Sequence, residues 1–242
     1  MKLSAIIPTK NEEGLIEKAV ASLTRAPGIS EVIVADGGST DATCKLAELA
    51  GARVVHCTQK GRGLQIAEAW QGCQSDVLVV LHADALFPRK GASAIANALR
   101  KQSIPGGAFS VGFSPSSPRT RFIARLNHLR ARLLGISFGD QCQFVRDSVL
   151  QKAGGFPAML LMEDVELSLI MKKAGKPVLL PEKVWVSPRR WEEVPFASSV
   201  LGVILLCSTY LFKRLLRHPP GTGQSYYNKY YRDKHDHHSV SP

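Results

Sequence analysis

The sequence predicts an α/β fold in which helices cover both faces of a mostly parallel central sheet. Strand-like and helix-like segments alternate three times before residue 100, which is the pattern of consecutive βαβ crossovers. The strongest strand signal is the unbroken apolar run 77–81, typical of a strand that is buried on both faces of a parallel sheet. The chain has 242 residues, of which 45% are hydrophobic, and is long enough for one large domain with a full core.

The expected elements follow one another closely in the N-terminal half. Strands are expected at 3–7, 31–35, 52–55 and 77–81, and the helices between them at 15–23, 42–50 and 64–72. Beyond residue 100 the alternation stops. A strand with one buried face is expected at 108–113, and further strands at 142–145 and 178–186.

The charge balance predicts an anionic partner. The chain has 31 Lys and Arg against 20 Asp and Glu, a net charge of +11, which suits the phosphates of a small ligand, nucleic acid or an acidic membrane surface. The five cysteines are odd in number and lack Cys-x-x-Cys spacing, which indicates reduced thiols and no zinc site. The N-terminus enters a strand at once and offers no signal peptide, so we expect a cytoplasmic globular part.

Four polar loops follow the first four strands. Because the carboxyl ends of parallel strands meet at one edge of a sheet, these loops are expected to face one another. They are residues 8–13 (Pro-Thr-Lys-Asn-Glu-Glu), 36–41 (Asp-Gly-Gly-Ser-Thr-Asp), 59–63 (Gln-Lys-Gly-Arg-Gly) and 82–84 (His-Ala-Asp).

Each loop also has a structural explanation. Thr9 or Asn11 is a suitable helix cap, and Ser39 would cap the helix after a tight turn, an explanation about as good as binding on that loop's own evidence. Asp84 is a poorer cap, because the next helical pattern begins near Lys90, too far along the chain.

Taken together, the loops describe a nucleoside-diphosphate site. Acidic, hydroxyl and amide groups in the first two suit a base and a ribose, and Lys60 and Arg62 among glycines suit a pyrophosphate. The Asp84 carboxylate suits a divalent ion that bridges the phosphates. Neither a Gly-x-Gly-x-x-Gly turn after the first strand nor a Gly-x-x-x-x-Gly-Lys-Ser/Thr motif occurs, which argues against dinucleotide dehydrogenases and P-loop enzymes.

In order and spacing these motifs resemble those of family-2 glycosyltransferases, inverting enzymes with the Rossmann-like GT-A fold. The segments 6–13, 36–41 and 82–84 are similar to that family's successive nucleotide and metal motifs. The likeness continues through 139–141, 154–157, 162–167 and 190–191, so it covers most of the chain up to about residue 191.

The resemblance implies roles for residues of the first four loops. Asp36 and Glu12 would contact the nucleobase, Ser39 and Thr9 would line the nucleotide pocket, and Asp84 would bind Mg²⁺ or Mn²⁺. His82 stands where the family's metal motif has its first acidic residue, so it is assigned to the ribose or the metal, and modest metal affinity is expected. The full set assigned to the nucleotide is Pro8, Thr9, Asn11, Glu12, Asp36, Ser39, Lys60, Arg62, His82 and Ala83.

The resemblance also assigns the reacting groups. Asp164 would be the general base, and an inverting transfer needs one such carboxylate to take the proton of the acceptor hydroxyl. Asp164 and Glu163 open the helical run 165–174, whose dipole favours ionised carboxylates, although acids at helix starts are also common for structural reasons. The acceptor or donor-sugar side is assigned to Asp140, Gln141, Glu163, Arg190 and Trp191, with Trp191 equally suited to anchoring the next helix.

Two further helices are basic or apolar. In the helix at 118–134, Phe122, Ile123, Leu126, Leu129 and Leu133 form an apolar stripe beside several arginines, a pattern that suits packing on the sheet or lying on an anionic membrane. The uncharged run 196–212 is at the short end of a membrane span and has basic residues at both ends. A helix resting on the membrane is favoured over a span, a core helix or a dimer seam.

These observations give one interpretation of the whole chain. We expect a transferase domain at 1–192, with a nucleotide half at 1–100 and an acceptor half at 101–192, then an apolar and basic helix at 193–218 and a polar tail at 219–242. The expected activity is a metal-dependent, hexosyltransferase-like transfer from a nucleotide-diphosphate sugar to a hydroxyl acceptor at the cytoplasmic face of the cell membrane. A lipid-linked acceptor is one option, and no nucleic-acid partner is expected. The alternatives are a non-catalytic nucleotide-sugar-binding module recruited to the membrane and, less well supported, nucleotidyl transfer.

Overall fold

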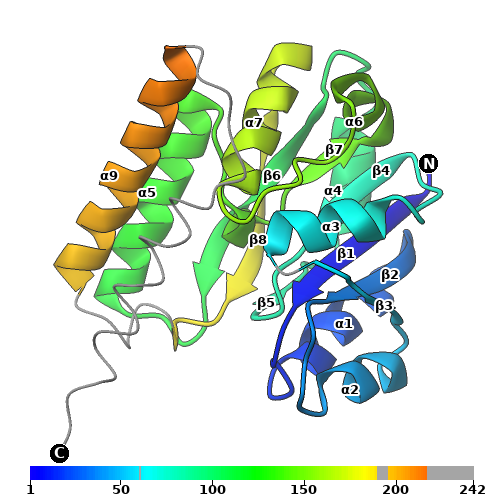
Figure 1. The fold of residues 1–242 in the computed structure, drawn as a ribbon. Coiled ribbons are helices and arrows are strands. Elements are labelled where there is room, and N and C mark those ends of the chain that lie inside the picture. Colours follow the sequence, from blue (N-terminus) through cyan, green and yellow to red (C-terminus); the bar gives the residue numbers. More distant parts are fainter. Residues whose placement is uncertain (60, 190–195, 217–242) are drawn as a thin grey trace, which may run out of the picture.

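The computed structural model describes residues 1–59, 61–189 and 196–216, without the side chains of 196–199. Within these ranges eight strands form one sheet in the order β3-β2-β1-β4-β7-β6-β8-β5 (Figure 1). The expectations for Lys60, Arg190, Trp191 and the tail at 219–242 fall outside the described residues. The strands are β1 (Leu3–Thr9), β2 (Ile29–Asp36), β3 (Arg53–His56), β4 (Val77–Val80), β5 (Ala85–Leu86), β6 (Gly106–Phe113), β7 (Phe144–Arg146) and β8 (Val178–Val186).

The helices connect and cover these strands. The first three lie between successive strands of the N-terminal half, as the alternating pattern predicts. In the described ranges the α-helices are α1 (Ile16–Thr24), α2 (Thr43–Leu49), α3 (Arg62–Trp70), α4 (Gly91–Ala98), α5 (Pro118–Leu134), α6 (Asp147–Ala153), α7 (Glu163–Ala174) and α9 (Phe196–Leu215), with a short 3₁₀ turn at Gly139–Gln141.

The sheet is mostly parallel, as expected. β2 and β4 both pair in parallel with β1, and β3 with β2. β7 is antiparallel to both β4 and β6, and β5 is antiparallel to β8. After β3 the chain crosses back past β2 and β1 to place β4 on the far side of β1, and such a reversal of strand order opens a crevice at the carboxyl ends of the strands.

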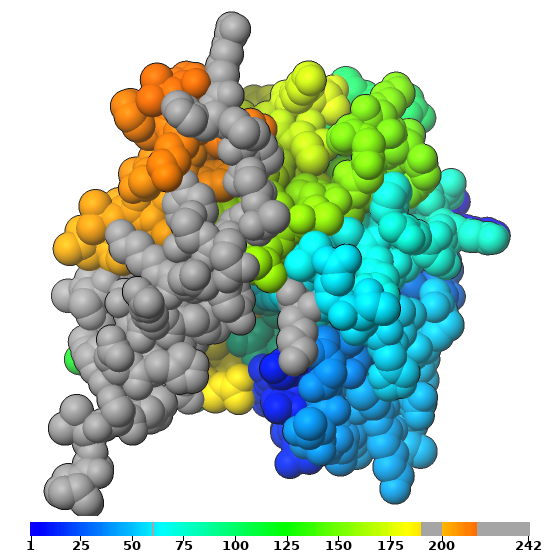
Figure 2. All heavy atoms as spheres, viewed as in Figure 1, coloured from blue at the N-terminus to red at the C-terminus, as the bar shows by residue number. Residues whose placement is uncertain are grey.

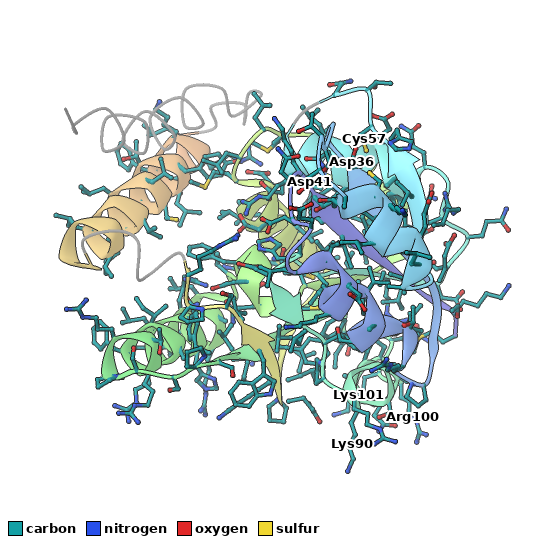
Figure 3. The ribbon with its side chains drawn as sticks, turned by 90° about the horizontal axis from the view of Figure 1, so that it is seen from below. Asp36, Asp41, Cys57, Lys90, Arg100 and Lys101 are labelled. Atoms are coloured by element: carbon teal, nitrogen blue, oxygen red, sulfur yellow. The ribbon has the colours of Figure 1, made fainter. Side chains whose placement is uncertain are left out.

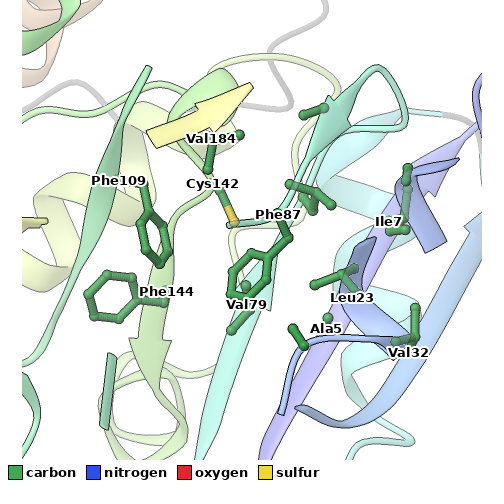
Figure 4. Close-up of a cluster of buried hydrophobic side chains, with 14 of the residues drawn as sticks. Ala5, Ile7, Leu23, Val32, Val79, Phe87, Phe109, Cys142, Phe144 and Val184 are labelled. Carbon is green, nitrogen blue, oxygen red and sulfur yellow. The ribbon is translucent and has the colours of Figure 1, made fainter. Parts of the chain in front are cut away.

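Alternate residues of the central strands fill a core on each face of the sheet. Ala5 and Val79 face α1, α4 and α5, in a cluster that also contains Phe87, Phe109 and Phe144 (Figure 4). Ile6 and Leu78 face α3, α6 and α7 on the other side. The prediction that helices cover both faces is therefore confirmed, because each strand presents apolar side chains in both directions.

The strand β6 differs from its prediction. Its alternating pattern predicted one buried face, but all eight of its residues are buried. One of the small residues packs tightly, since a Cβ on Gly112 would overlap the Trp185 ring of β8. The alternation therefore reflects close approach of β8 to β6, and not exposure to solvent.

The helix α5 packs on the sheet through a different face from the predicted stripe. Its buried residues are Thr120, Ile123 and Asn127. Phe122, Leu129 and Leu133 are 49%, 53% and 70% exposed. Packing on the sheet therefore accounts for Ile123 but not for most of the stripe.

The helix α9 lies at one edge of the molecule, away from the N-terminal half (Figure 2). Its Tyr210 is only 1% exposed and packs in a small cluster with Met159, Met162 and Val165, at the start of α7. Among the described helices, none has both the length and the apolar character needed to cross a membrane.

Candidate functional site

The first two polar loops are joined by a ladder of hydrogen bonds. The backbone N–H of Asn11 donates to Ser39 Oγ at 2.9 Å, and Asn11 Oδ1 accepts from the Thr40 N–H at 2.8 Å. The Glu12 N–H donates to Thr43 Oγ1 at 2.8 Å. Neither Thr9, Asn11 nor Ser39 caps a helix, because the residues before α1 and α2 are Leu15 and Ala42 and make no side-chain cap. The expected convergence of these two loops is confirmed.

Asp36 holds the shape of the second loop. The N–H groups of Gly38 and Ser39 both donate to its carboxylate at 3.1 Å, and Ser39 Oγ donates as well. Burial raises the pKa of Asp36, but these hydrogen bonds outweigh burial and leave its pKa below the ordinary value. Figure 3 shows Asp36 and Asp41 near each other, at the opposite end of the molecule from the exposed bases Lys90, Arg100 and Lys101. Asp36 is therefore a buried anion at the sheet edge.

The first loop contacts a residue that sequence reasoning did not single out. Arg189, just beyond β8, forms an ion pair with Glu12, with an N–O distance of 3.2 Å. Beside Glu12, Thr9 Oγ1 is buried and has no hydrogen-bond partner among the residues that the structure covers. The residues just after β8 also contact the fourth loop, because the Ser187 N–H donates to the Asp84 carbonyl at 2.9 Å. The end of β8 therefore joins the first loop to the fourth.

The His82 side chain lies against the turn at Gly139. A Cβ on Gly139 would overlap the His82 imidazole, so only glycine allows this approach. Asp84 does not cap the following helix, which begins at Gly91 with Lys90 before it. Both His82 and Asp84 line a cavity of about 460 Å³, and Asp84 is half-buried there.

Asp164 lines the same cavity from the start of α7. Its Oδ2 accepts from the Gly139 N–H at 2.9 Å and its Oδ1 from the Val165 N–H at 2.8 Å. Met162, two residues before Asp164, has a φ of 74°, a conformation that non-glycine residues rarely adopt and that is often found at functional sites. The chain therefore turns sharply where it brings Asp164 to the cavity that Asp84 also lines.

Arg62 is held by Glu163. The Arg62 Nε lies 2.9 Å from Glu163 Oε1, and Arg62 itself lines the cavity. Burial raises the pKa of Glu163 to about 7; Arg62 opposes this rise and Asp164 adds to it. Glu163 is only 2% exposed and lies behind the cavity wall, so it positions Arg62 and is not placed to touch an acceptor. That is a correction to its assignment.

A second polar network supports the turn at 139–141. Asp140 accepts from Asn127 Nδ2 at 2.9 Å and lines the cavity. Gln141 is fully buried and accepts from the Arg130 guanidinium at 2.8 Å. Burial lowers the pKa of Arg130, against the effect of Asp140 and Asp164. The expected acceptor contact of Gln141 is therefore wrong, because its side chain ties the turn to α5 from within the core.

The donor atoms around Asp84 suit a hard divalent cation. Carboxylate oxygens are the preferred ligands of Mg²⁺ and Mn²⁺, which also retain water and substrate phosphate oxygens as ligands. Asp84 supplies such an oxygen in the cavity, with the His82 ring beside it. Elsewhere in the part of the chain that the structure covers, Asp36, Cys44 and His56 place potential ligand atoms within 4.8 Å of one another.

The structure brings together five of the predicted site residues. Arg62, His82, Asp84, Asp140 and Asp164 all line one cavity. The residues assigned to the nucleoside lie in the two joined loops, which the pair of Arg189 and Glu12 connects to the cavity edge at Ser187. In the sequence, the one sign of a role for Arg189 is that it follows shortly after the strand β8.

Comparisons with known proteins agree with this arrangement. The sequence model described as Glycosyl transferase family 2 matches residues 4–152. Glycosyltransferase AglJ of Haloferax volcanii is 31% identical over 134 residues, which are 55% of this chain and 43% of AglJ. This chain thus spans less than half the length of that relative.

Solved structures share the fold. Mannosyltransferase PcManGT from Pyrobaculum calidifontis, in complex with GDP-Man and Mn²⁺, is 22% identical, with a TM-score of 0.59 over 76% of this chain and 56% of that one. S. aureus TarS 1-349, in complex with UDP-GlcNAc, is 18% identical, with a TM-score of 0.62 over 77% of this chain and 58% of that one. The expected GT-A fold is confirmed.

Proposed function

Because this chain belongs to glycosyl transferase family 2, we propose that it transfers one sugar from a nucleoside-diphosphate sugar to a hydroxyl acceptor, with inversion at the anomeric carbon. The observation that carries the proposal is the shared cavity of Asp84 and Asp164, which come from opposite halves of the chain. A carboxylate that holds a cation and a carboxylate that accepts a proton are the two groups this reaction requires.

Asp164 is the general base in this proposal. Its two oxygens each accept one backbone N–H, which leaves lone pairs for the acceptor hydroxyl. The acceptor O–H bond breaks, its proton passes to Asp164, and the oxygen bonds to the anomeric carbon as the bond from that carbon to the diphosphate oxygen breaks. Attack on the face opposite the leaving group inverts the configuration.

The nucleoside diphosphate lies along the joined loops. Ser39, Asp36 and the buried hydroxyl of Thr9 hold the nucleoside end, and the Arg62 guanidinium faces the diphosphate. Asp84, with His82 beside it, holds Mg²⁺ or Mn²⁺. When bound, this cation neutralises charge on the departing diphosphate. PcManGT, solved with GDP-Man and Mn²⁺, supports this assignment by analogy of fold.

We assign the enzyme to the cytoplasmic face of the membrane and its acceptor to lipid-linked hydroxyls. Both α5 and α9 expose apolar side chains, and α5 also carries exposed arginines, a combination that suits an anionic lipid surface. The apolar residues concerned are Phe122, Leu129 and Leu133 on α5 and Leu201, Ile204, Leu205 and Phe212 on α9.

A thermal-shift panel of nucleoside diphosphates, with and without Mn²⁺, tests the binding half of the proposal. Asp164→Asn then tests the chemistry, because it keeps the shape and removes the base. We expect unchanged nucleoside-diphosphate binding and a loss of turnover of about 10²-fold or more. Glu17→Gln, which changes an exposed acid in the first turn of α1, is the matched control and should be fully active.

Two outcomes would overturn the proposal. Turnover of Asp164→Asn at the wild-type rate would show that this carboxylate is not the base. Binding of donor by the wild-type protein with no transfer to any hydroxyl acceptor would favour the alternative of a non-catalytic nucleotide-sugar-binding module.

A further inference from the structure

The cavity that holds Asp84 and Asp164 has a large apolar part. Beyond the polar groups it continues between α5 and α9, where most lining residues are apolar, with Asn127, Arg130 and Ser208 as polar exceptions. Figure 3 shows α5 and α9 as separate helices on the same side of the molecule. The apolar lining includes Ile123, Leu126 and Leu134 from α5 and Val203, Leu206 and Leu211 from α9.

The α9 wall of this cavity is fixed to the helix that carries Asp164. Tyr210 Oη donates to Glu166 Oε1 at 2.6 Å, and the Arg214 guanidinium forms two hydrogen bonds with the same carboxylate at 2.6 and 3.0 Å. Glu166 is 5% exposed, so the carboxylate of this ion pair is shielded from water, while the Arg214 side chain is partly exposed. Glu166 lies in the first turn of α7, as does Asp164. The apolar wall and the candidate base are therefore held in one rigid unit.

Such an apolar surface does not suit a water-soluble sugar as the acceptor. An aliphatic wall offers no hydrogen bonds, and a polar acceptor placed against it would lose hydration without compensation. A hydrocarbon chain gains free energy there in proportion to the area removed from water. Because the same cavity ends at Asp164, the occupant must also present a polar, reactive group at that end.

We propose that the apolar part of the cavity, between α5 and α9, binds the hydrocarbon chain of the acceptor, with the acceptor hydroxyl directed to Asp164. This inference rests on the proposed transferase function and specifies the acceptor as a single-chain amphiphile. The cavity volume of about 460 Å³ lies within the range of roughly 300–1,000 Å³ that is typical of small-ligand pockets. A medium-length chain and its first polar group fit this volume.

Hexyl, octyl and decyl β-glucoside, each below its micelle concentration, are suitable probes, because they share one hydroxyl-bearing head and differ in the chain alone. Titration calorimetry with the full-length protein should give affinities that rise about fourfold per added methylene, the value for full burial of a methylene group. Equal affinities for the three glucosides would overturn the inference.

Two matched variants test where the chain binds. Val203→Trp fills the cavity from α9 and should weaken octyl glucoside binding about tenfold and remove the dependence on chain length. Thr209→Trp makes a change of similar size at an exposed position of the same helix that does not line the cavity, and it should bind octyl glucoside like the wild type. Binding to Val203→Trp at wild-type strength would place the chain elsewhere and would also overturn the inference.

A second substitution guards against misfolding of the tryptophan variant. Val203→Thr keeps the side-chain shape and replaces one methyl group by a hydroxyl, so it should weaken octyl glucoside binding about threefold while the unfolding temperature stays near that of the wild type. Nucleoside-diphosphate binding should be unchanged in every variant. If the wild-type protein does not bind nucleoside diphosphates, the proposed function itself is wrong. If it binds them but shows no effect of glucoside chain length, only this inference is wrong.

Discussion

The buried pair of Arg62 and Glu163 makes the folding stability depend on pH in a predictable direction. Burial raises the pKa of Glu163 from 4.5 to about 7 in the folded protein. Between these two pH values the folded protein keeps a proton on Glu163 that the unfolded chain releases. The free energy of unfolding contributed by this group therefore falls as pH rises from 4.5 to about 7 and is constant above that range.

The size of the effect follows from the same pKa difference. At roughly 1.4 kcal/mol per pKa unit, the loss over this range is at most about 3 kcal/mol. Glu163→Gln removes the charge that must be buried and keeps an oxygen that accepts from Arg62. The compared quantity is the free energy of unfolding of Glu163→Gln minus that of the wild type. We expect this difference to be about 3 kcal/mol larger above pH 7 than at pH 4.5.

Urea unfolding of the two proteins across this pH range measures the difference, because effects of other titrating groups cancel in the comparison. Glu17→Gln, at an exposed position, is the control and should show no such trend. A difference between Glu163→Gln and the wild type that does not change with pH would refute the reasoning, since it would mean that Glu163 has the same pKa in the folded and the unfolded protein.

Three further predictions concern the loops of the site. Asp84→Ala should remove the effect of Mn²⁺ on nucleoside-diphosphate binding, and thermal shifts that still respond to Mn²⁺ would contradict the assignment of the metal. Gly139→Ala should destabilise the protein by about 1–3 kcal/mol in urea unfolding because its Cβ meets His82, whereas Gly14→Ala, with open space around it, should not. Ser39→Ala should cost about 1 kcal/mol and weaken nucleoside-diphosphate binding, because the joined loops lose a hydroxyl; a variant with wild-type stability and binding would speak against that role.

The sequence predicted the features that follow from strand geometry. Alternation of strands and helices fixes where parallel strands end, and that edge is where the loops containing Asn11, Ser39 and Asp84 lie. The apolar run at 77–81 likewise identified β4, because a strand buried on both faces has no polar alternation.

Other features depend on contacts between distant residues. Arg189 and Glu12 are 177 positions apart, and no local pattern connects them. Gln141 was assigned to the acceptor side because it follows a loop, but its partner on α5 draws it into the core. The apolar stripe of α5 predicted a face for packing on the sheet, although a hydrophobic stripe does not reveal whether protein, ligand or lipid covers it.

The resemblance and the physical argument support different parts of the account. Membership of glycosyl transferase family 2 rests on the match to residues 4–152. The assignment of Asp164 and Asp84 to one reaction centre rests on the cavity that both line. Glu163 shows why the distinction matters, because a motif that resembles a family pair contains one residue in the cavity and one behind its wall.

Anomalous diffraction from crystals grown with Mn²⁺ and the nucleoside diphosphate that gives the largest thermal shift tests the central claim most directly. We predict a manganese peak bonded to the Asp84 carboxylate, inside the cavity that Asp164 also lines, with the diphosphate oxygens as further ligands. A manganese peak at Asp36, Cys44 and His56, or a nucleoside diphosphate bound away from Asp84, would contradict the account.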